Sequence, residues 1–571
     1  MPSANSFILE ALVDFPDDAM KALAPITAPH IDAFMRVLSE AGVRRVSWGS
    51  YGDGHGGYLL PDGLDEAWTC YARTLDNLGN PLRVAVEAGH RYGIEVYGYF
   101  KPYETGPAVL LPEGSPEARA HGRLWQQGGY LAWLDPFVLR HPQLRIRRHS
   151  DAAVGQQKPV CSIRLTKRDD APTRITAEHL QIWTSELNYR YQRLPLNLEV
   201  AETVEPSPRD VHDLDGHLVT GAGEPVRVLT LSGFCLSDRH LLVTTDFQEG
   251  PADFENTGVD LMTALDAEGK EIPGVFATGA AVWEGKRVDF REWGLIFDFG
   301  WARQLVRLDE PNEAPTSSMG YGSGRKGLIA FSGGRNEYLP GALCETEPAV
   351  QAYWLSWVQE MIDAGVDGVD FRVENHSTHS DFAEEYGFND VVLEGAAARN
   401  PQDPLAAVPA VRGEAYTSFL REAKALLSGH GRRMRINLNF DFFRPDPPAW
   451  RLPAYPLNMH FDWEQWVAEG LMDAAILRFY HQPFDFLFDD PVATAMIEAC
   501  RQRNIPLVVN RYINDEYEAE FRRIRRDGRF DGFVLYETAS MINWSDPGDM
   551  AITSAPARAV CELAAAAESG A

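Results

Sequence analysis

Amphipathic helix-like and strand-like segments alternate without a break from about residue 346 to the end of the chain, and this alternation constrains the fold most strongly. Five strands are expected at 366–373, 433–440, 474–480, 505–511 and 530–536, with helices between them at 412–429, 461–472, 491–504, 516–528 and 556–568. Three more strands are expected earlier, at 7–13, 43–51 and 94–100. Eight strands separated by helices predict a (β/α)8 TIM barrel, an α/β fold.

The joints between helices and strands support repeated units. Ser39-Glu-Ala-Gly-Val43 and Ile362-Asp-Ala-Gly-Val366 both place a glycine where a helix ends in a left-handed residue, and Gly93 precedes Ile94 in the same way.

The regular alternation stops after the third strand. Between residues 158 and 301 the pattern is strand-like throughout, with turn signals such as Asp213-Leu-Asp-Gly216. We therefore expect a β-sandwich domain inserted after strand three. The predicted domains are 1–157 (barrel strands one to three), 158–301 (the sandwich) and 302–571 (barrel strands four to eight).

Composition excludes some classes of partner. The 571 residues carry a net charge of −29, which disfavours nucleic acid. The N-terminus has no basic and apolar leader, and no run approaches a membrane span. The six cysteines are scattered without C-x-x-C spacing, which argues against a disulfide framework or a zinc knuckle, fits a reducing compartment and predicts a cytoplasmic protein. The sequence leaves homo-oligomer formation open.

The stretch Val369 to Glu374 indicates where chemistry would occur. Its alternation puts Val369, Phe371 and Val373 on one face and Asp370, Arg372 and Glu374 on the other. Because barrel enzymes act at the C-terminal ends of their strands, Glu374 is the first catalytic candidate. The alternative is a structural ion pair between Asp370 and Arg372, with Glu374 an ordinary loop residue.

Polar and aromatic side chains gather at the other strand ends. Sugar rings stack on flat apolar side chains and pair their hydroxyls with amides and charged groups, so this composition favours a carbohydrate ligand. The predicted substrate-binding residues are Trp48, Lys101, Tyr103, Glu104, Asp370, Arg372, His376, His379, Asn439, Arg478, Tyr480, Asn510 and Arg511.

Hydrolysis of a glycosidic bond requires two carboxyl groups, one protonated and one ionised. Glu374 and Glu537 are best placed by strand register, and Asp441 is the alternative partner. Arg372 would keep a neighbouring carboxylate ionised, which favours Glu374 as nucleophile or base. Retention and inversion both stay open.

The segment Ala364-Gly-Val-Asp-Gly-Val-Asp-Phe-Arg-Val-Glu374 resembles the fourth-strand motif of alpha-amylase-type glycoside hydrolase barrels. The layout and Asp531-Gly-Phe-Val-Leu-Tyr-Glu537 also resemble poorly characterised bacterial glycoside-hydrolase-like barrels. The resemblance implies a glycosidase acting on an oligosaccharide or polysaccharide, with Glu374 at the nucleophile position and Arg372 at the arginine position. Glutamate replaces the family's aspartate, and strand five carries Asn439 and Asp441 instead of the family's acid glutamate.

Two other functions remain. A metal-dependent barrel hydrolase or isomerase would use His376, His379, Asp370 or Glu374, but His-x-x-His in a loop is weakly diagnostic, and we expect no metal and no cofactor. A non-catalytic carbohydrate-binding protein would use the inserted domain instead.

Overall fold

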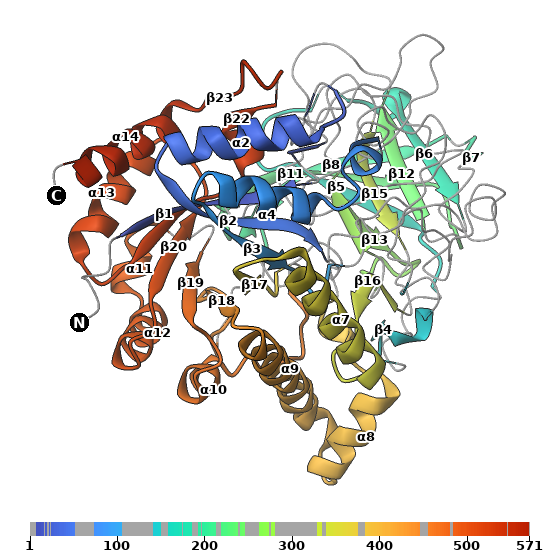
Figure 1. Cartoon of the computed structure of the whole chain (residues 1–571). Helices are drawn as coiled ribbons and strands as arrows, with labels where there is room; N and C mark the ends of the chain where they lie inside the picture. The colour runs from blue at the N-terminus through green and yellow to red at the C-terminus, as the bar shows by residue number, and fades with distance from the viewer. Residues whose placement is uncertain are drawn as a thin grey trace.

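The structure, a computed structural model, describes residues 7–51, 73–104, 141–149, 158–245, 262–279, 328–374, 383–445, 455–479 and 483–569, with short gaps inside some of these ranges. Eight parallel strands close into a barrel in the order β1-β2-β3-β17-β18-β19-β20-β21 (Figure 1). They are β1 (Ile8–Asp14), β2 (Val43–Tyr51), β3 (Glu95–Phe100), β17 (Gly368–Phe371), β18 (Arg433–Asn439), β19 (Ala474–Arg478), β20 (Leu507–Arg511) and β21 (Gly532–Leu535). The predicted (β/α)8 barrel is confirmed.

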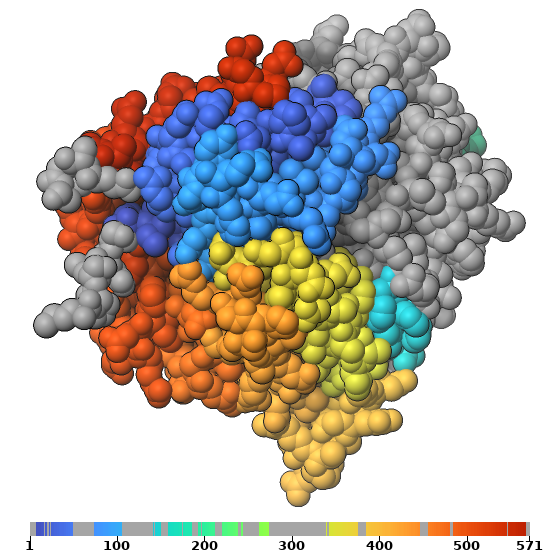
Figure 2. All heavy atoms as spheres, viewed as in Figure 1, coloured from blue at the N-terminus to red at the C-terminus, as the bar shows by residue number. Residues whose placement is uncertain are grey.

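Helices surround this barrel. They are α2 (Ala28–Glu40), α4 (Pro81–Arg91), α7 (Pro348–Ala364), α8 (Asp390–Arg399), α9 (Pro404–Gly429), α10 (Trp463–Glu469), α11 (Phe486–Asp489), α12 (Pro491–Gln502), α13 (Tyr517–Asp527) and α14 (Ala555–Ser569). Helix α8 and the start of α9 project from the edge of the molecule (Figure 2). No helix in the described part of the chain is long and apolar enough to cross a membrane.

Local signals in the sequence set the helix ends. Asp490 begins α12 by accepting hydrogen bonds from the backbone N–H groups of Val492 and Ala493, and a proline follows it at the first helical position. Gly42, Gly93 and Gly365 have φ angles of 87°, 70° and 95°. The predicted left-handed glycine at each joint is therefore confirmed.

The barrel strands divide their side chains between two environments. Val369, Phe371 and Val373 point outward into the large core shared with the helices, as predicted. The opposite parity of each strand points into the barrel interior, which we call the lumen. The part of the lumen near the N-terminal ends of the strands, which we call the lower lumen, is ionic. Glu10 binds Arg45 at 2.6 Å and Arg435 at 2.7 Å through its two oxygens.

A β-rich part lies between β3 and β17 in the sequence. One sheet has the order β13-β5-β11-β8 and another the order β14-β15-β12-β6-β7. Their strands are β5 (Ser162–Thr166), β6 (Leu180–Ser185), β7 (Gln192–Arg193), β8 (Glu199–Pro206), β11 (Pro225–Ser232), β12 (His240–Thr245), β13 (Met262–Leu265), β14 (Phe276–Gly279) and β15 (Leu328–Gly333). Leu165 and Leu231 from the first sheet and Ile182 and Val243 from the second share one hydrophobic cluster. Strand β15 carries this part past residue 301, and that predicted boundary itself lies outside the described residues.

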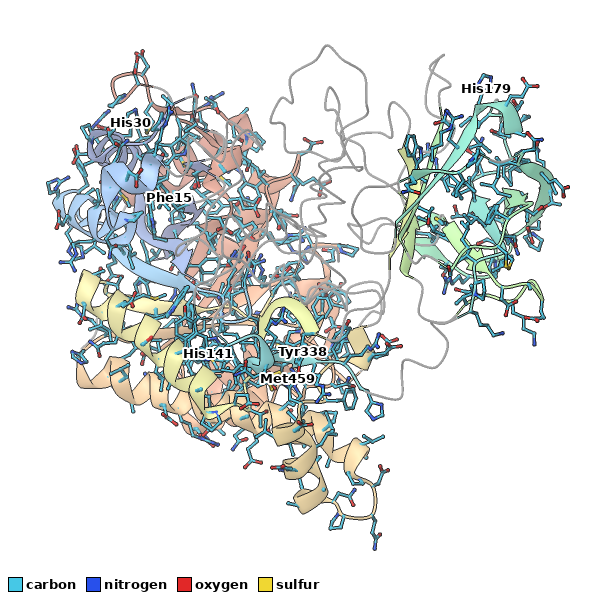
Figure 3. The ribbon with its side chains drawn as sticks, turned by 90° about the vertical axis from the view of Figure 1, so that its right-hand side faces the viewer. Phe15, His30, His141, His179, Tyr338 and Met459 are labelled. Atoms are coloured by element: carbon cyan, nitrogen blue, oxygen red, sulfur yellow. A yellow bond between two sulfur atoms is a disulfide. The ribbon has the colours of Figure 1, made fainter. Side chains whose placement is uncertain are left out.

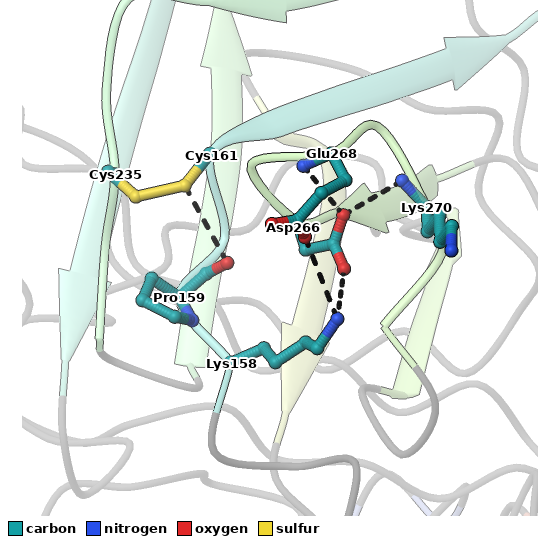
Figure 4. Close-up of a disulfide and its surroundings, with 7 residues drawn as sticks. All are labelled: Lys158, Pro159, Cys161, Cys235, Asp266, Glu268 and Lys270. Atoms are coloured by element: carbon teal, nitrogen blue, oxygen red, sulfur yellow. Dashed lines mark hydrogen bonds and ion pairs between the residues drawn. A yellow bond between two sulfur atoms is a disulfide. The ribbon is translucent and has the colours of Figure 1, made fainter.

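The β-rich part has its own core and its own covalent link. Its hydrophobic cluster shares no residue with the barrel core; in Figure 3, His179 is labelled in the β-rich part and Phe15 in the barrel. Cys161 and Cys235 form a disulfide beside the ion pair of Lys158 with Asp266 (Figure 4). This disulfide disagrees with the expectation of a reducing compartment. Disulfides are typical of oxidising compartments, so the cysteines no longer support the cytoplasmic prediction.

Candidate active site

The carboxylate of Glu374 lies at the C-terminal end of the lumen, directly beyond β17. Its Oε2 atom is 3.2 Å from Nη2 of Arg372 and 3.0 Å from Nε of Arg478. The hydroxyl of Tyr455 donates to the same oxygen at 3.4 Å. All four side chains are buried. Two guanidinium groups beside one buried carboxylate favour its ionised form.

The two arginines also share a phenol. Nη1 of Arg372 donates to the hydroxyl oxygen of Tyr536 at 3.0 Å, and Nη2 of Arg478 donates to the same atom at 2.5 Å. Arg372 donates in addition to the hydroxyl of Tyr99 at 2.7 Å. Burial raises the pKa of Tyr99 and of Tyr536 above the ordinary value, so both are neutral phenols at physiological pH.

Glu537 is the second predicted carboxyl group. It follows β21 and has a φ of 61°, a left-handed conformation that costs about 1–3 kcal/mol for a residue other than glycine. Burial raises the pKa of Tyr512, and the negative charges of Glu537 and Glu374 raise it further. Both carboxyl groups therefore act on the same phenol at the mouth of the barrel.

Asp441, the alternative partner, also lies near Glu374. Its side chain is fully buried, and its backbone N–H donates to Oδ1 of Asn439 at 2.9 Å. Burial raises the pKa of Tyr455, and the charges of Glu374 and Asp441 both contribute to this rise. The structure thus brings all three predicted acids close to the tyrosines around Glu374.

Amide groups flank Arg478 on the neighbouring strands. In the barrel register, Arg478 pairs with Asn439 on one side and with Asn510 on the other. The Nδ2 atoms of both asparagines are buried and have no hydrogen-bond partner among the residues that the structure describes. Because Oδ1 of Asn439 accepts from Asp441, its Nδ2 end is the one left to donate to a ligand.

Lys101 and Glu104 occupy another sector of the mouth. The Lys101 ammonium is 3.0 Å from Asp14 and 3.1 Å from Glu104, and all three side chains are buried or nearly so. This cluster lies at the ends of β1 and β3, and β3 is the neighbour of β17 in the barrel.

Three predicted binding residues point away from the lumen. Trp48 stacks on Phe15 at a centroid distance of 4.8 Å, within the outer core. Arg511 forms an ion pair with Glu520 of α13 at 3.0 Å. Tyr103 packs against helices α7 and α9, where its hydroxyl donates to Glu345. Strand parity turns Trp48 and Arg511 outward, and none of the three can contact a substrate in the lumen; this corrects the expectation.

Asp370 does face the lumen, but one layer below Glu374. Its carboxylate accepts from Arg435 at 3.0 Å, Ser47 at 3.1 Å and Asn437 at 2.6 Å. These partners make Asp370 a structural carboxylate, which corrects its predicted role in binding. The alternative pairing of Asp370 with Arg372 is also wrong, because Arg372 pairs with Glu374.

Three further predicted residues, His376, His379 and Tyr480, lie outside the described residues. Within the described ranges, no group of three His, Cys, Asp or Glu side chains is arranged to hold a metal ion. The sequence interpretation assigned no role to Tyr536 or Tyr455. The lumen parity of Tyr536, two residues after Val534, could have indicated it, whereas Tyr455 lies in a loop without any periodic signal.

A cavity of about 230 Å³ opens at the opposite, N-terminal end of the barrel. Tyr97, Arg433 and Arg435 line it, and Arg433 and Arg435 are ion-paired with Glu95 and Glu10 respectively. In (β/α)8 barrels this end contributes to stability and the C-terminal end carries the chemistry. We therefore place the candidate active site around Glu374.

Comparisons with known proteins give structural similarities only. No protein-family model matches the chain, and no curated protein matches it. The chain is similar to the glycoside hydrolase domain of PelA from Pseudomonas aeruginosa, with 15% identity and a TM-score of 0.20 over 38% of this chain and 66% of that one, slightly under two thirds. It is similar to the catalytic domain of beta-amylase from Paenibacillus polymyxa, with 8% identity and a TM-score of 0.36 over 99% of both chains. It is also similar to the GH18 chitinase ChiB of Flavobacterium johnsoniae, with 10% identity and a TM-score of 0.21 over 39% of this chain and 68% of that one. At these TM-scores the similarities carry no argument about activity.

Proposed function

We propose that this barrel hydrolyses glycosidic bonds in an oligosaccharide or polysaccharide. The observation that carries the proposal is the buried carboxylate of Glu374, held at the C-terminal mouth of the lumen between Arg372 and Arg478. Two further carboxyl groups lie nearby: the charge of Glu537 acts on Tyr512 and that of Asp441 acts on Tyr455, and the charge of Glu374 acts on both tyrosines. A pair of carboxyl groups in different electrostatic surroundings is the requirement of glycoside hydrolysis.

In the proposed mechanism Glu374 is the ionised member of the pair. It either attacks the anomeric carbon directly, forming a glycosyl-enzyme that water then hydrolyses to release Glu374, or it removes a proton from a water molecule that attacks that carbon. Glu537 or Asp441 is the acid, whose proton passes to the glycosidic oxygen as the bond to the leaving sugar breaks. The Nδ2 groups of Asn439 and Asn510 donate hydrogen bonds to hydroxyl groups of the sugar.

The substitution Glu374→Gln tests the proposal. It removes the negative charge and retains the shape, so turnover should fall by roughly a thousandfold or more. The measurement is reducing-sugar release from a panel of oligosaccharides and aryl glycosides, at a temperature where circular dichroism shows the variant folded. Full activity in this variant would contradict the role of Glu374.

Glu345→Gln is the matched control. Glu345 is also buried and binds Arg412 of α9 at 2.6 and 3.0 Å, and it accepts from Tyr103, which points away from the lumen. Breaking this pair should lower the free energy of unfolding by about 3–5 kcal/mol. Turnover per folded molecule should stay at the wild-type value.

A second comparison identifies the acid. An activated aryl glycoside has a leaving group that needs no proton, whereas an unactivated disaccharide does. Replacing the true acid, by Glu537→Gln or by Asp441→Asn, should therefore slow disaccharide hydrolysis far more than aryl glycoside hydrolysis. Equal losses on both substrates in both variants would remove these two residues as candidates for the acid.

A further inference from the structure

Three barrel strands converge on one hydroxyl group beneath Glu374. Arg372 follows β17, Arg478 ends β19 and Tyr536 follows β21, so the contacts cross the lumen rather than follow one wall. The hydroxyl oxygen of Tyr536 accepts hydrogen bonds from both guanidinium groups, at 3.0 and 2.5 Å. The ring of Tyr536 also lies 4.3 Å from the guanidinium carbon of Arg478.

This arrangement brings two positive charges together in a buried place. The pKa of Arg478 is raised above its ordinary value: burial and repulsion by Arg372 favour the neutral form, but Tyr536, Tyr99 and Glu374 together favour the charged form more strongly. Both arginines contact the same carboxylate oxygen, Oε2 of Glu374. An oxygen that accepts from both guanidinium groups offsets part of their mutual repulsion.

We infer that Tyr536 is a positioning residue, which holds Arg372 and Arg478 in the geometry in which both contact Oε2 of Glu374. Without the phenol oxygen the two guanidinium groups separate, and their hold on the carboxylate weakens. The placement of the arginines follows from the contacts alone. Its consequence for turnover rests on the proposed function.

The other titratable groups around Glu374 come from several elements and also affect the charge of its carboxyl group. Tyr455 approaches from the loop before α10, Asp441 from the end of β18, and Tyr512 from the end of β20. Glu537 follows Tyr536 at the end of β21. A change in the position of the arginines therefore changes the charge around the Glu374 carboxylate.

The test is Tyr536→Phe, which removes the oxygen and keeps the ring. The pKa of Glu374 should rise by about one unit, because an opposite charge in close contact is weakened. It is measured in the ligand-free protein by carbon-13 NMR titration of the glutamate carboxyl groups, with Glu374 assigned from the spectrum of Glu374→Gln. A pKa unchanged from wild type would overturn the inference, whatever the activity.

Activity gives a second readout. If Glu374 must be ionised, turnover is lost as the pH falls through its pKa, so a raised pKa moves the acidic limb of the kcat/KM profile to higher pH. At the pH optimum, kcat should fall on the order of a hundredfold, because misplaced groups no longer support the transition state. A purely structural role would lower stability and leave the acidic limb in place.

Tyr97→Phe is the matched control. Tyr97 is also a fully buried lumen tyrosine between arginines, with its ring 4.8 Å from the guanidinium carbon of Arg435, but it lies in the layer below the site. It should change neither the pKa of Glu374 nor the acidic limb.

If Tyr536→Phe does not fold, Tyr99→Phe decides, because it removes the other phenol acceptor of Arg372 and must raise the pKa of Glu374 by a smaller amount. Absence of turnover in the wild type would contradict the proposed function, while the NMR titration would still decide the role of Tyr536.

Discussion

Removal of a single charged residue in the ionic layer of the lumen should cost more stability than removal of a surface ion pair. Glu10 neutralises both Arg45 and Arg435, and the side chains of all three are at most 9% exposed. Glu10→Gln leaves two buried guanidinium groups without that charge, so the free energy of unfolding should fall by about 3–5 kcal/mol in urea denaturation. Glu40→Gln, which removes an exposed i,i+4 pair with Arg36, should change it by less than about 0.5 kcal/mol. Equal effects of the two changes would contradict this account of the ionic layer.

The side chains of residues 369–374 show how much of the candidate site the sequence could predict. Alternation along 369–374 correctly predicted which side chains face the lumen. It could not predict that Asp370 would pair with Arg435, because that partner depends on the register between β17 and β18. Trp48 and Arg511 lie near strand ends, but the parity of β2 and β20 turns both side chains outward, toward Phe15 and Glu520 respectively.

At the scale of elements, helix α9 depends on one close contact. A Cβ atom on Gly413 would lie 2.0 Å from the backbone oxygen of His460, so Gly413→Ala must displace the helix or the segment that precedes α10. The melting temperature should fall by several degrees, since strain of this kind costs about 1–3 kcal/mol. Gly429→Ala at the end of the same helix has nothing within 4 Å and should be neutral or slightly stabilising. A neutral Gly413→Ala would contradict the close packing.

The start of helix α9 is an element boundary that the sequence pattern did not predict. The sequence predicted a helix at 412–429, but α9 begins at Pro404 and contains Pro409. A proline inside a helix usually ends it, because its ring clashes with the preceding turn and it donates no hydrogen bond. Here the carbonyl of Pro409 accepts from the backbone N–H of His460, a tertiary contact that no local pattern reveals.

At the scale of the whole molecule, the barrel and the β-rich part have separate hydrophobic cores. The disulfide Cys161–Cys235 spans 74 residues within the β-rich part and should stabilise that part by about 4 kcal/mol through loop closure. Calorimetry with and without reductant should therefore show one transition that moves down and one, from the barrel, that does not. The double variant Cys161→Ser with Cys235→Ser should reproduce the shift and respond no further to reductant. A single transition that moves as a whole would contradict the independence of the two cores.

The fold was predictable because eight similar units repeat the same periodicity and the same glycine joints. The disulfide was not, because the two cysteines are distant in sequence and become neighbours only through the pairing of β5 with β11.

The central claim is that a sugar binds in the C-terminal mouth of the lumen against Glu374. A crystal structure of Glu374→Gln soaked with mixed oligosaccharides tests it most directly, because the variant should bind without turning over. We predict a glycosidic bond beside residue 374, with a carboxyl group of Glu537 or Asp441 within hydrogen-bond distance of the glycosidic oxygen. Sugar bound only on the β-rich part, with the mouth of the barrel empty, would contradict the claim.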